Sequence, residues 1–183
     1  PALTGATRML VCAEDLGMVP TCVPWGMNDL RILTLEIQSM SKNPDYEFGH
    51  LEENPYRSVA TISTHDMATL RGWWDEDAER TQRFYNYMLQ KDGDAPHPMP
   101  GWLCEEVVAR HLFCPSMLCL LSLQDWLSMD EQLRYPDADF ERINVPANPR
   151  HYWRYRMHLT IEQLMEQRDF NEKVSTLIKR SGR

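Results

Sequence analysis

The sequence predicts an α/β fold in which about four parallel strands are covered by helices. Four apolar runs have the length of buried strands, and helical patterns or long inserts separate them along the chain. Each run is continuously apolar rather than alternating, as is typical of strands buried on both faces of a parallel sheet. The predicted strands comprise residues 9–17, 32–38, 58–64 and 116–125.

The first half of the chain predicts one helix and one long loop besides its strands. The first strand breaks at Glu14, Asp15 and a glycine. Residues 21–30 predict a helix, because their apolar side chains share one face and Pro24 fits only the first turn. Residues 39–57 form a polar loop that is longer than a simple connection, and long ordered loops are often functional.

The second half predicts further helices. An acidic first turn, which the helix dipole favours, opens a predicted helix over residues 75–90, and residues 102–113 predict another. We expect Asp125 to cap the helix that follows the fourth strand. Thr160 and Gln163 have the spacing of a capping box, and a basic helix ends the chain.

Composition excludes several classes of protein. The 183 residues contain 43% hydrophobic and 10% aromatic side chains, which is enough to bury a core in what we expect to be one piece of structure, residues 1–183. A net charge of −8 disfavours nucleic acid and anionic membrane surfaces as partners. No apolar run approaches the roughly 20 residues of a spanning helix, and no signal peptide is visible.

Five cysteines without a CxxC spacing indicate a reducing, cytoplasmic compartment and no metal–thiolate site. The chain also lacks the glycine-rich loops of nucleotide enzymes. We therefore predict no cofactor.

Polar or acidic side chains stand at the end of every predicted strand. Ligands of parallel α/β folds bind beyond the carboxyl ends of the strands, so these groups mark the expected site. The four ends read Glu14-Asp15, Glu36-Ile37-Gln38, His65-Asp66 and Gln124-Asp125.

These residue types suit the cleavage of glycosidic bonds. Glu14 stands at a strand end, where we expect apolar surroundings to raise its pKa, so it could protonate a departing oxygen. Asp66 could accept hydrogen bonds from sugar hydroxyls while His65 donates to a neighbouring one. Trp73 and Trp74 could provide flat faces for sugar rings.

Other interpretations remain open at this point. Asp15 and Asp125 could be helix caps only, a lone His-Asp pair is often structural, and Trp74 could simply pack a helix. A noncatalytic sugar-binding module would explain the tryptophans but not the acidic strand ends. A metal-dependent hydrolase would use the same carboxylates, but no HxH or HExxH spacing is present.

Five motifs occur in an order that resembles a known family. They are CAEDLGMVP, STHDMATLRGWW, SLQDWLSMDE, RINVPANP and YWRYRM. The chain resembles the C-terminal part of the catalytic domain of the 4-α-glucanotransferases, the amylomaltases and disproportionating enzymes of glycoside hydrolase family 77. The resemblance extends from Met9 to the helix that begins TIEQL.

The resemblance implies the C-terminal half of a TIM (β/α)8 barrel and the retaining transfer of α-1,4-glucan segments between maltodextrins. It implies that Glu14 is the general acid/base and Asp66 the transition-state stabiliser, and that Asp15, His65 and Asn144 contact substrate.

The family's nucleophilic aspartate belongs to a motif on an earlier strand, and no such motif precedes Glu14. We expect the upstream half of the same barrel to supply it. The chain alone is then expected to be inactive, and to self-associate through its open sheet edges.

Overall fold

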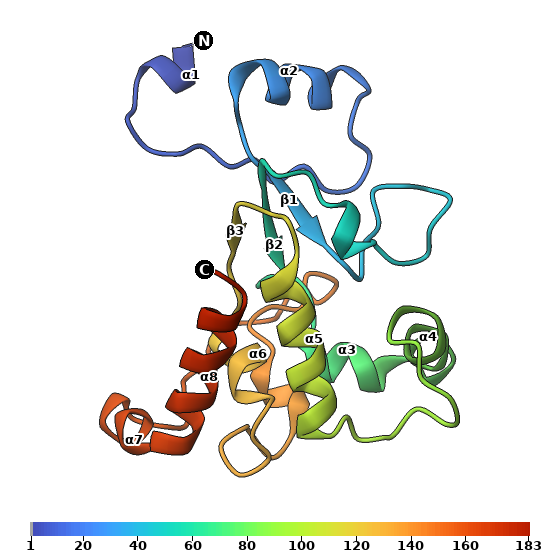
Figure 1. Cartoon of the computed structure of the whole chain (residues 1–183), viewed down its shortest axis with the longest axis vertical. Helices are drawn as coiled ribbons and strands as arrows, with labels where there is room; N and C mark the ends of the chain where they lie inside the picture. The colour runs from blue at the N-terminus through green and yellow to red at the C-terminus, as the bar shows by residue number, and fades with distance from the viewer. Residues whose placement is uncertain (1) are drawn as a thin grey trace. The chain divides into compact units, whose positions relative to one another are not determined.

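The computed structural model describes residues 2–183, which divide into two compact units (Figure 1). Unit 1 contains the residues up to Thr61 together with Cys114–Leu120. Unit 2 contains Ile62–Phe113 and Leu121–Arg183. No helix in the described part of the chain is long and apolar enough to cross a membrane.

Unit 1 is built on a parallel sheet, as predicted. Among the described residues its strands are ordered β1-β2-β3, all parallel. They comprise β1 (Thr34–Ile37), β2 (Ser58–Thr61) and β3 (Leu118–Cys119). All four residues of the central strand β2 are buried, as expected of a strand that is covered on both faces.

The first predicted strand is much shorter than expected. The backbone of residues 9–17 pairs with the sheet at an isolated parallel bridge between Cys12 and Leu33. The next amide along the ladder, that of Leu35, donates to Oδ1 of Asp15 at 2.9 Å. The ladder ends here because an aspartate side chain takes the position that a backbone carbonyl would occupy in a longer strand.

The prediction for residues 116–125 was wrong beyond Cys119. Residues 123–127 form helix α6 (Leu123–Leu127), and Ser122 is its N-cap, with Oγ accepting from the amide of Asp125 at 3.1 Å. Asp125 therefore lies inside the first turn and is not the cap that we expected. An apolar run with a serine in it fits a capped buried helix as well as a strand.

The predicted helix of unit 1 is confirmed as α2 (Cys22–Leu30), with Pro24 in its first turn. Arg31 ends it in the left-handed conformation, with φ of 55°. A short α1 (Ala2–Gly5) precedes it, and the 3-10 turn η1 (Leu51–Glu53) interrupts the long loop.

In unit 2, the single helix predicted over residues 75–90 is instead a broken series that starts earlier. It comprises α3 (Leu70–Glu76), α4 (Ala78–Arg83) and the π-helical turn η2 (Phe84–Met88). Asp77 separates the first two, because its backbone is extended and its side chain accepts from the amide of Arg80 at 2.9 Å. Asp77, which we predicted in the acidic first turn of a single helix, is thus the N-cap of the second helix, α4.

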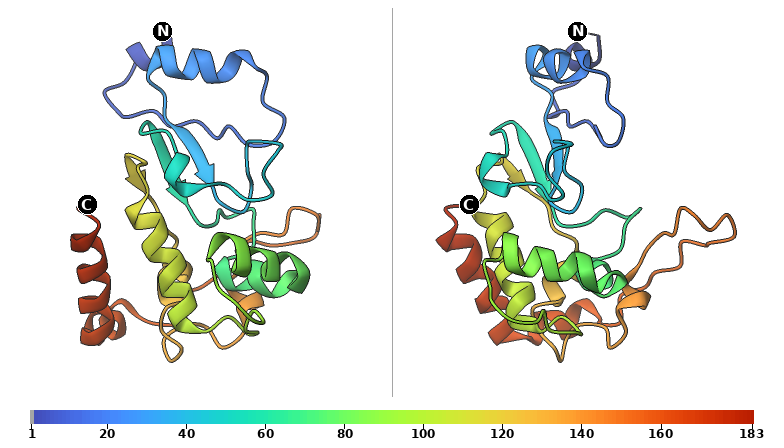
Figure 2. Two further views of the ribbon diagram at one scale, coloured as in Figure 1. Left: turned by 45° about the vertical axis from the view of Figure 1, so that its right-hand side comes forward. Right: turned by 90° about the vertical axis from the view of Figure 1, so that its right-hand side faces the viewer.

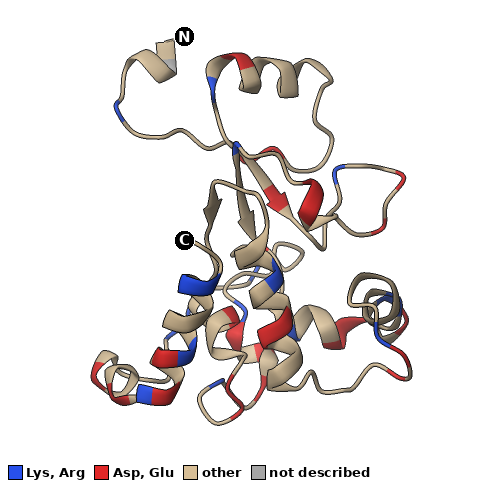
Figure 3. Ribbon diagram, viewed as in Figure 1, with Lys and Arg blue, Asp and Glu red and all other residues tan. Residues whose placement is uncertain are grey.

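The other predicted helices of unit 2 are confirmed. They are α5 (Gly101–Phe113), α7 (Ile161–Glu166) and the basic α8 (Arg168–Arg180), and a 3-10 turn, η3 (Ala138–Glu141), lies between α6 and α7. Thr160 and Gln163 form both halves of the capping box. Helices α5 and α8 pack against each other (Figure 2), and the last turn of α8 carries Lys179 and Arg180 (Figure 3).

Candidate active site

His65 and Asp66 lie in the loop of unit 2 that leads into α3. The Nε2 atom of His65 is 3.4 Å from Oδ2 of Asp66, and the two side chains are 51% and 45% exposed. Both groups therefore reach solvent, as side chains that contact a substrate must.

Two residues of unit 2 from much later in the sequence complete this group. Asn144 Nδ2 donates to Oδ1 of Asp66 at 2.6 Å, and the Trp153 ring lies 5.1 Å from the His65 ring. One oxygen of Asp66 thus accepts a hydrogen bond from the Asn144 amide, and the other oxygen faces the His65 ring. We call His65, Asp66, Asn144 and Trp153 the Asp66 cluster.

A fully buried carboxylate fixes the loop that carries Asp66. Asp125 accepts from Ser63 Oγ at 2.6 Å and from the Leu70 amide at 2.9 Å, which lie on either side of residues 64–69. Ser122 Oγ donates to it as well, at 2.8 Å. Burial raises the pKa of Asp125, and these three hydrogen bonds oppose the rise. The loop is therefore clamped at both ends by one side chain.

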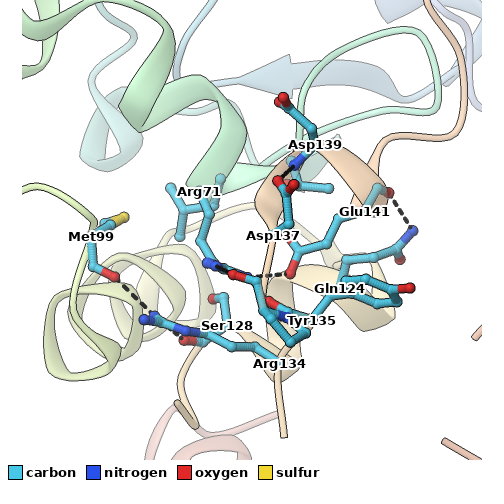
Figure 4. A network of polar contacts seen from close by, with 12 residues as sticks. Arg71, Met99, Gln124, Ser128, Arg134, Tyr135, Asp137, Asp139 and Glu141 are labelled. Atoms are coloured by element: carbon cyan, nitrogen blue, oxygen red, sulfur yellow. Dashed lines mark hydrogen bonds and ion pairs between the residues drawn. The ribbon is translucent and has the colours of Figure 1, made fainter. Parts of the chain in front are cut away.

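A buried ion pair joins the start of α3, directly after this loop, to η3 (Figure 4). Arg71 Nη1 lies 2.6 Å from Oε1 of Glu141, and Thr69 Oγ1 donates to Oε2 at 2.9 Å. Arg71 Nη1 also donates to the carbonyl of Tyr135 at 2.7 Å. Burial raises the pKa of Glu141, and the Arg71 charge lowers it. Because Glu141 lies three residues before Asn144, the pair helps to place that amide beside Asp66.

The two tryptophans of the GWW sequence have other contacts. Trp74 is fully buried, and its Nε1 donates to the carbonyl of Pro96 at 2.9 Å, so its packing role is the correct interpretation. The Arg80 guanidinium covers the Trp73 ring at 4.4 Å, and Phe84 meets that ring edge-on. Neither ring offers the flat open face that the sequence suggested.

The acidic residues of unit 1 form a separate group. Asp15, whose side chain is 8% exposed, accepts from the Leu35 amide and lies 2.8 Å from Lys42 Nζ, which also lies 3.0 Å from Glu36. Both oxygens of Asp15 are thus engaged by the protein. Glu14 beside it is exposed.

Within residues 2–183, no group of three or more His, Cys, Asp or Glu side chains could hold a metal ion. The carboxylates of Asp15, Asp125 and Glu141 are instead engaged by amides, hydroxyls and cations of the protein.

Comparison with known proteins decides the family. The model of the family described as 4-alpha-glucanotransferase matches residues 2–161. The chain belongs to this family.

Its relatives are longer proteins. A 4-alpha-glucanotransferase DPE2 of Oryza sativa subsp. japonica is 38% identical over 183 residues, which are all of this chain and 19% of that protein. The 4-alpha-glucanotransferase of Chlamydia caviae is 28% identical over 94% of this chain and 32% of its own. The chain thus spans between a fifth and a third of these relatives.

The fold is similar to that of two solved amylomaltases. Amylomaltase from Streptococcus agalactiae, solved in complex with acarbose, superposes with a TM-score of 0.68 at 18% identity over 94% of this chain and 32% of that one. Amylomaltase from Corynebacterium glutamicum gives 0.67, also at 18% identity, over 92% and 28%.

In this member of the family, the structure brings together three of the five predicted site residues: His65, Asp66 and Asn144. Glu14 and Asp15 belong to unit 1. Sequence reasoning missed Trp153, although its ring is 58% exposed and it lies in the quoted motif YWRYRM. Its position as an aromatic residue in a polar, arginine-rich stretch was the feature of the sequence that could have identified it as a site residue.

Proposed function

We propose that this chain is the C-terminal half of the catalytic barrel of a 4-α-glucanotransferase. The activity is the retaining transfer of α-1,4-glucan segments between maltodextrins. The observation that carries the proposal is the Asp66 cluster, in which an exposed aspartate accepts a hydrogen bond from Asn144 and lies beside His65, within a chain of this family. The acarbose complex of the S. agalactiae amylomaltase supports an α-glucan as the substrate.

Asp66 is the transition-state stabiliser in this proposal. A carboxylate held in place beforehand stabilises positive charge on the sugar ring as it develops, without reorganising during the reaction. His65 and Asn144 hold that carboxylate and present their remaining polar atoms to sugar hydroxyls. Trp153 supplies the flat apolar face for a sugar ring, the role that the sequence suggested for Trp73 and Trp74.

Glu14 is the general acid/base, and its exposed carboxyl is accessible to a glycosidic oxygen. For Asp15 we propose a structural role in addition to the substrate contact that the resemblance implies. It fixes the backbone next to Glu14, because it holds the Leu35 amide and Lys42.

A retaining mechanism also needs a nucleophilic carboxylate about 5 Å from the acid. We place this aspartate on an earlier strand of the same barrel, outside residues 1–183. The compartment we propose is the cytoplasm, because none of the five cysteines forms a disulfide within residues 2–183.

Product analysis with maltotriose tests the proposal. The full-length protein should convert maltotriose into glucose and longer maltodextrins, and exhaustive chelation should leave the rate unchanged. The 183-residue chain alone should give no products above background. Binding of maltodextrins without transfer by the full-length protein would favour a glucan-binding module, and loss of activity to a chelator would favour a metal-dependent hydrolase.

A further inference from the structure

The segment that follows η3 is basic in an otherwise acidic chain. Residues 142–161 contain four arginines and neither Asp nor Glu, whereas the whole chain has a net charge of −8. In Figure 2 most of this segment is the orange loop that extends from the helices of unit 2. The arginines are Arg142, Arg150, Arg154 and Arg156.

All four arginines line one pocket of unit 2, with a volume of about 530 Å³. This volume lies within the roughly 300–1,000 Å³ of small-molecule sites. Its walls are also aromatic, because the rings of Tyr135 and Phe140 stack at 5.6 Å and Tyr152 lies beneath the guanidinium of Arg154 at 5.4 Å. The pocket therefore combines cationic groups with flat apolar faces.

Most of this positive charge is not neutralised within the described part of the chain. Arg142 lies 2.9 Å from Glu76, but Arg150, Arg154 and Arg156 have no carboxylate within ion-pair distance among residues 2–183. The one carboxylate in the lining is Asp139, which is exposed. The pocket thus carries an excess of guanidinium groups, which bind phosphate through two parallel hydrogen bonds.

The pocket adjoins the Asp66 cluster. Arg142 Nε donates to the carbonyl of Asn144 at 3.0 Å, and His151 Nε2 donates to that of Ile143 at 2.9 Å. A ligand in the pocket therefore lies against the same loop that holds Asp66.

We propose that this pocket binds a phosphate ester of a sugar, with the arginines on the phosphate and the aromatic rings on the sugar. The phosphate can be carried by a glucan chain or by a free sugar phosphate, and both present the same dianion to the arginines. The first case rests on the proposed function, because the glucan would also reach the Asp66 cluster. A neutral glucan can accept hydrogen bonds from these guanidinium groups, but only a phosphate also balances the positive charge that the described residues leave unpaired.

Calorimetric titration of the full-length protein tests this assignment. The probes are a singly phosphorylated maltooligosaccharide, the same oligosaccharide without phosphate, glucose 6-phosphate and inorganic phosphate. At low salt we expect the phosphorylated oligosaccharide to bind at least tenfold more tightly than its neutral counterpart, and the advantage to shrink as salt is added. The double variant Arg150→Gln/Arg154→Gln should lose most of the advantage. Arg180→Gln, an exposed arginine of α8, is the matched control and should keep it.

The probes separate the two sources of phosphate. Glucose 6-phosphate binding as tightly as the phosphorylated oligosaccharide assigns the pocket to free sugar phosphates, and much weaker binding assigns it to phosphate on a glucan. Equal affinity for the neutral and phosphorylated oligosaccharides, or an advantage that survives in the double variant, overturns the assignment. Transfer with neutral maltotriose is measured separately on the same variants and should be unchanged, so a failure of the proposed function remains distinguishable.

Discussion

The side-chain amide of Asn144 donates a 2.6 Å hydrogen bond to Asp66, although the two residues are 78 positions apart in the sequence. The acceptor is a half-exposed carboxylate whose other oxygen faces His65 at 3.4 Å. The orientation of the proposed transition-state stabiliser therefore depends on a loop from a different part of the chain.

Replacing Asn144 should impair the chemical step more than substrate binding. Asn144→Ala removes a hydrogen bond to a charged group, and we expect kcat for maltotriose transfer to fall roughly tenfold. Asn144→Asp should be worse, because it places a second negative charge beside Asp66. Steady-state kinetics of the full-length protein provide the measurement. Asn148→Ala in the same loop is the control, and an equal loss in that variant would attribute the effect to loop structure.

The two carboxylates proposed for catalysis should be indispensable. Glu14→Gln keeps the shape of the side chain but cannot donate a proton, so transfer should fall by about 10²- to 10⁴-fold while glucan binding is largely retained. Asp66→Asn should also be severe, because it removes the charge that stabilises the sugar ring. The exposed Asp45→Asn is a matched control and should have normal turnover. Near-normal turnover of Glu14→Gln would exclude this residue as the acid.

Asp125 should act through the loop that it clamps. Asp125→Asn replaces an acceptor oxygen by an amide donor, so one or more of the Ser63, Ser122 and Leu70 donors lose their partner inside the protein. We expect a loss of about 2–3 kcal/mol in unfolding free energy together with lower kcat. Urea unfolding and turnover of the same sample check this. Unchanged kcat in a measurably destabilised variant would contradict a role in positioning Asp66.

Removing only one partner of the Arg71–Glu141 pair should strongly reduce the free energy of unfolding. Arg71→Met or Glu141→Leu leaves a buried charge without its partner, and about 3–5 kcal/mol of stability should be lost. The double variant Arg71→Met/Glu141→Leu should recover a large part of that loss, because no buried charge then remains. A double-mutant cycle measures the coupling. Losses that simply add would show that the pair is not coupled.

His111 should make stability fall in mild acid. Complete burial lowers its pKa to about 4, since the folded protein disfavours the charged ring, while Nδ1 lies 2.8 Å from the carbonyl of Val107. The unfolded chain binds this proton near pH 6.5, so stability is full above that pH and is lost as the pH falls from about 6.5 to about 4. The loss approaches roughly 3 kcal/mol.

Thermal unfolding of the full-length protein between pH 4 and 7 provides the measurement. In His111→Phe the pH dependence should be flatter than in the parent, whereas His50→Phe, at a partly exposed histidine, should leave it unchanged. A slope that persists in His111→Phe would assign the acid sensitivity to other groups.

The sequence by itself determined the parallel α/β class, the helices α2, α5 and α8, the capping box at Thr160 and the family. Periodicity and capping are interactions between residues a few positions apart, so they can be read locally. His65, Asp66 and Asn144 were predicted as site residues because each lies in a short sequence motif, which can also be read locally. Strand length was less predictable, because the side chain of Asp15 ends one ladder and the cap at Ser122 turns an apolar run into a helix.

Only the tertiary structure decided what each polar side chain contacts. Asp125 and Asp66 both follow apolar runs, yet one is fully buried under three hydrogen bonds and the other is half exposed beside Asn144. The same holds for Trp74 and Trp153, of which the first is buried and the second is open to solvent. A carboxylate or an indole has no local preference that selects between these environments. The packing of distant segments selects it, since burial requires partners that only the folded chain brings within hydrogen-bond distance.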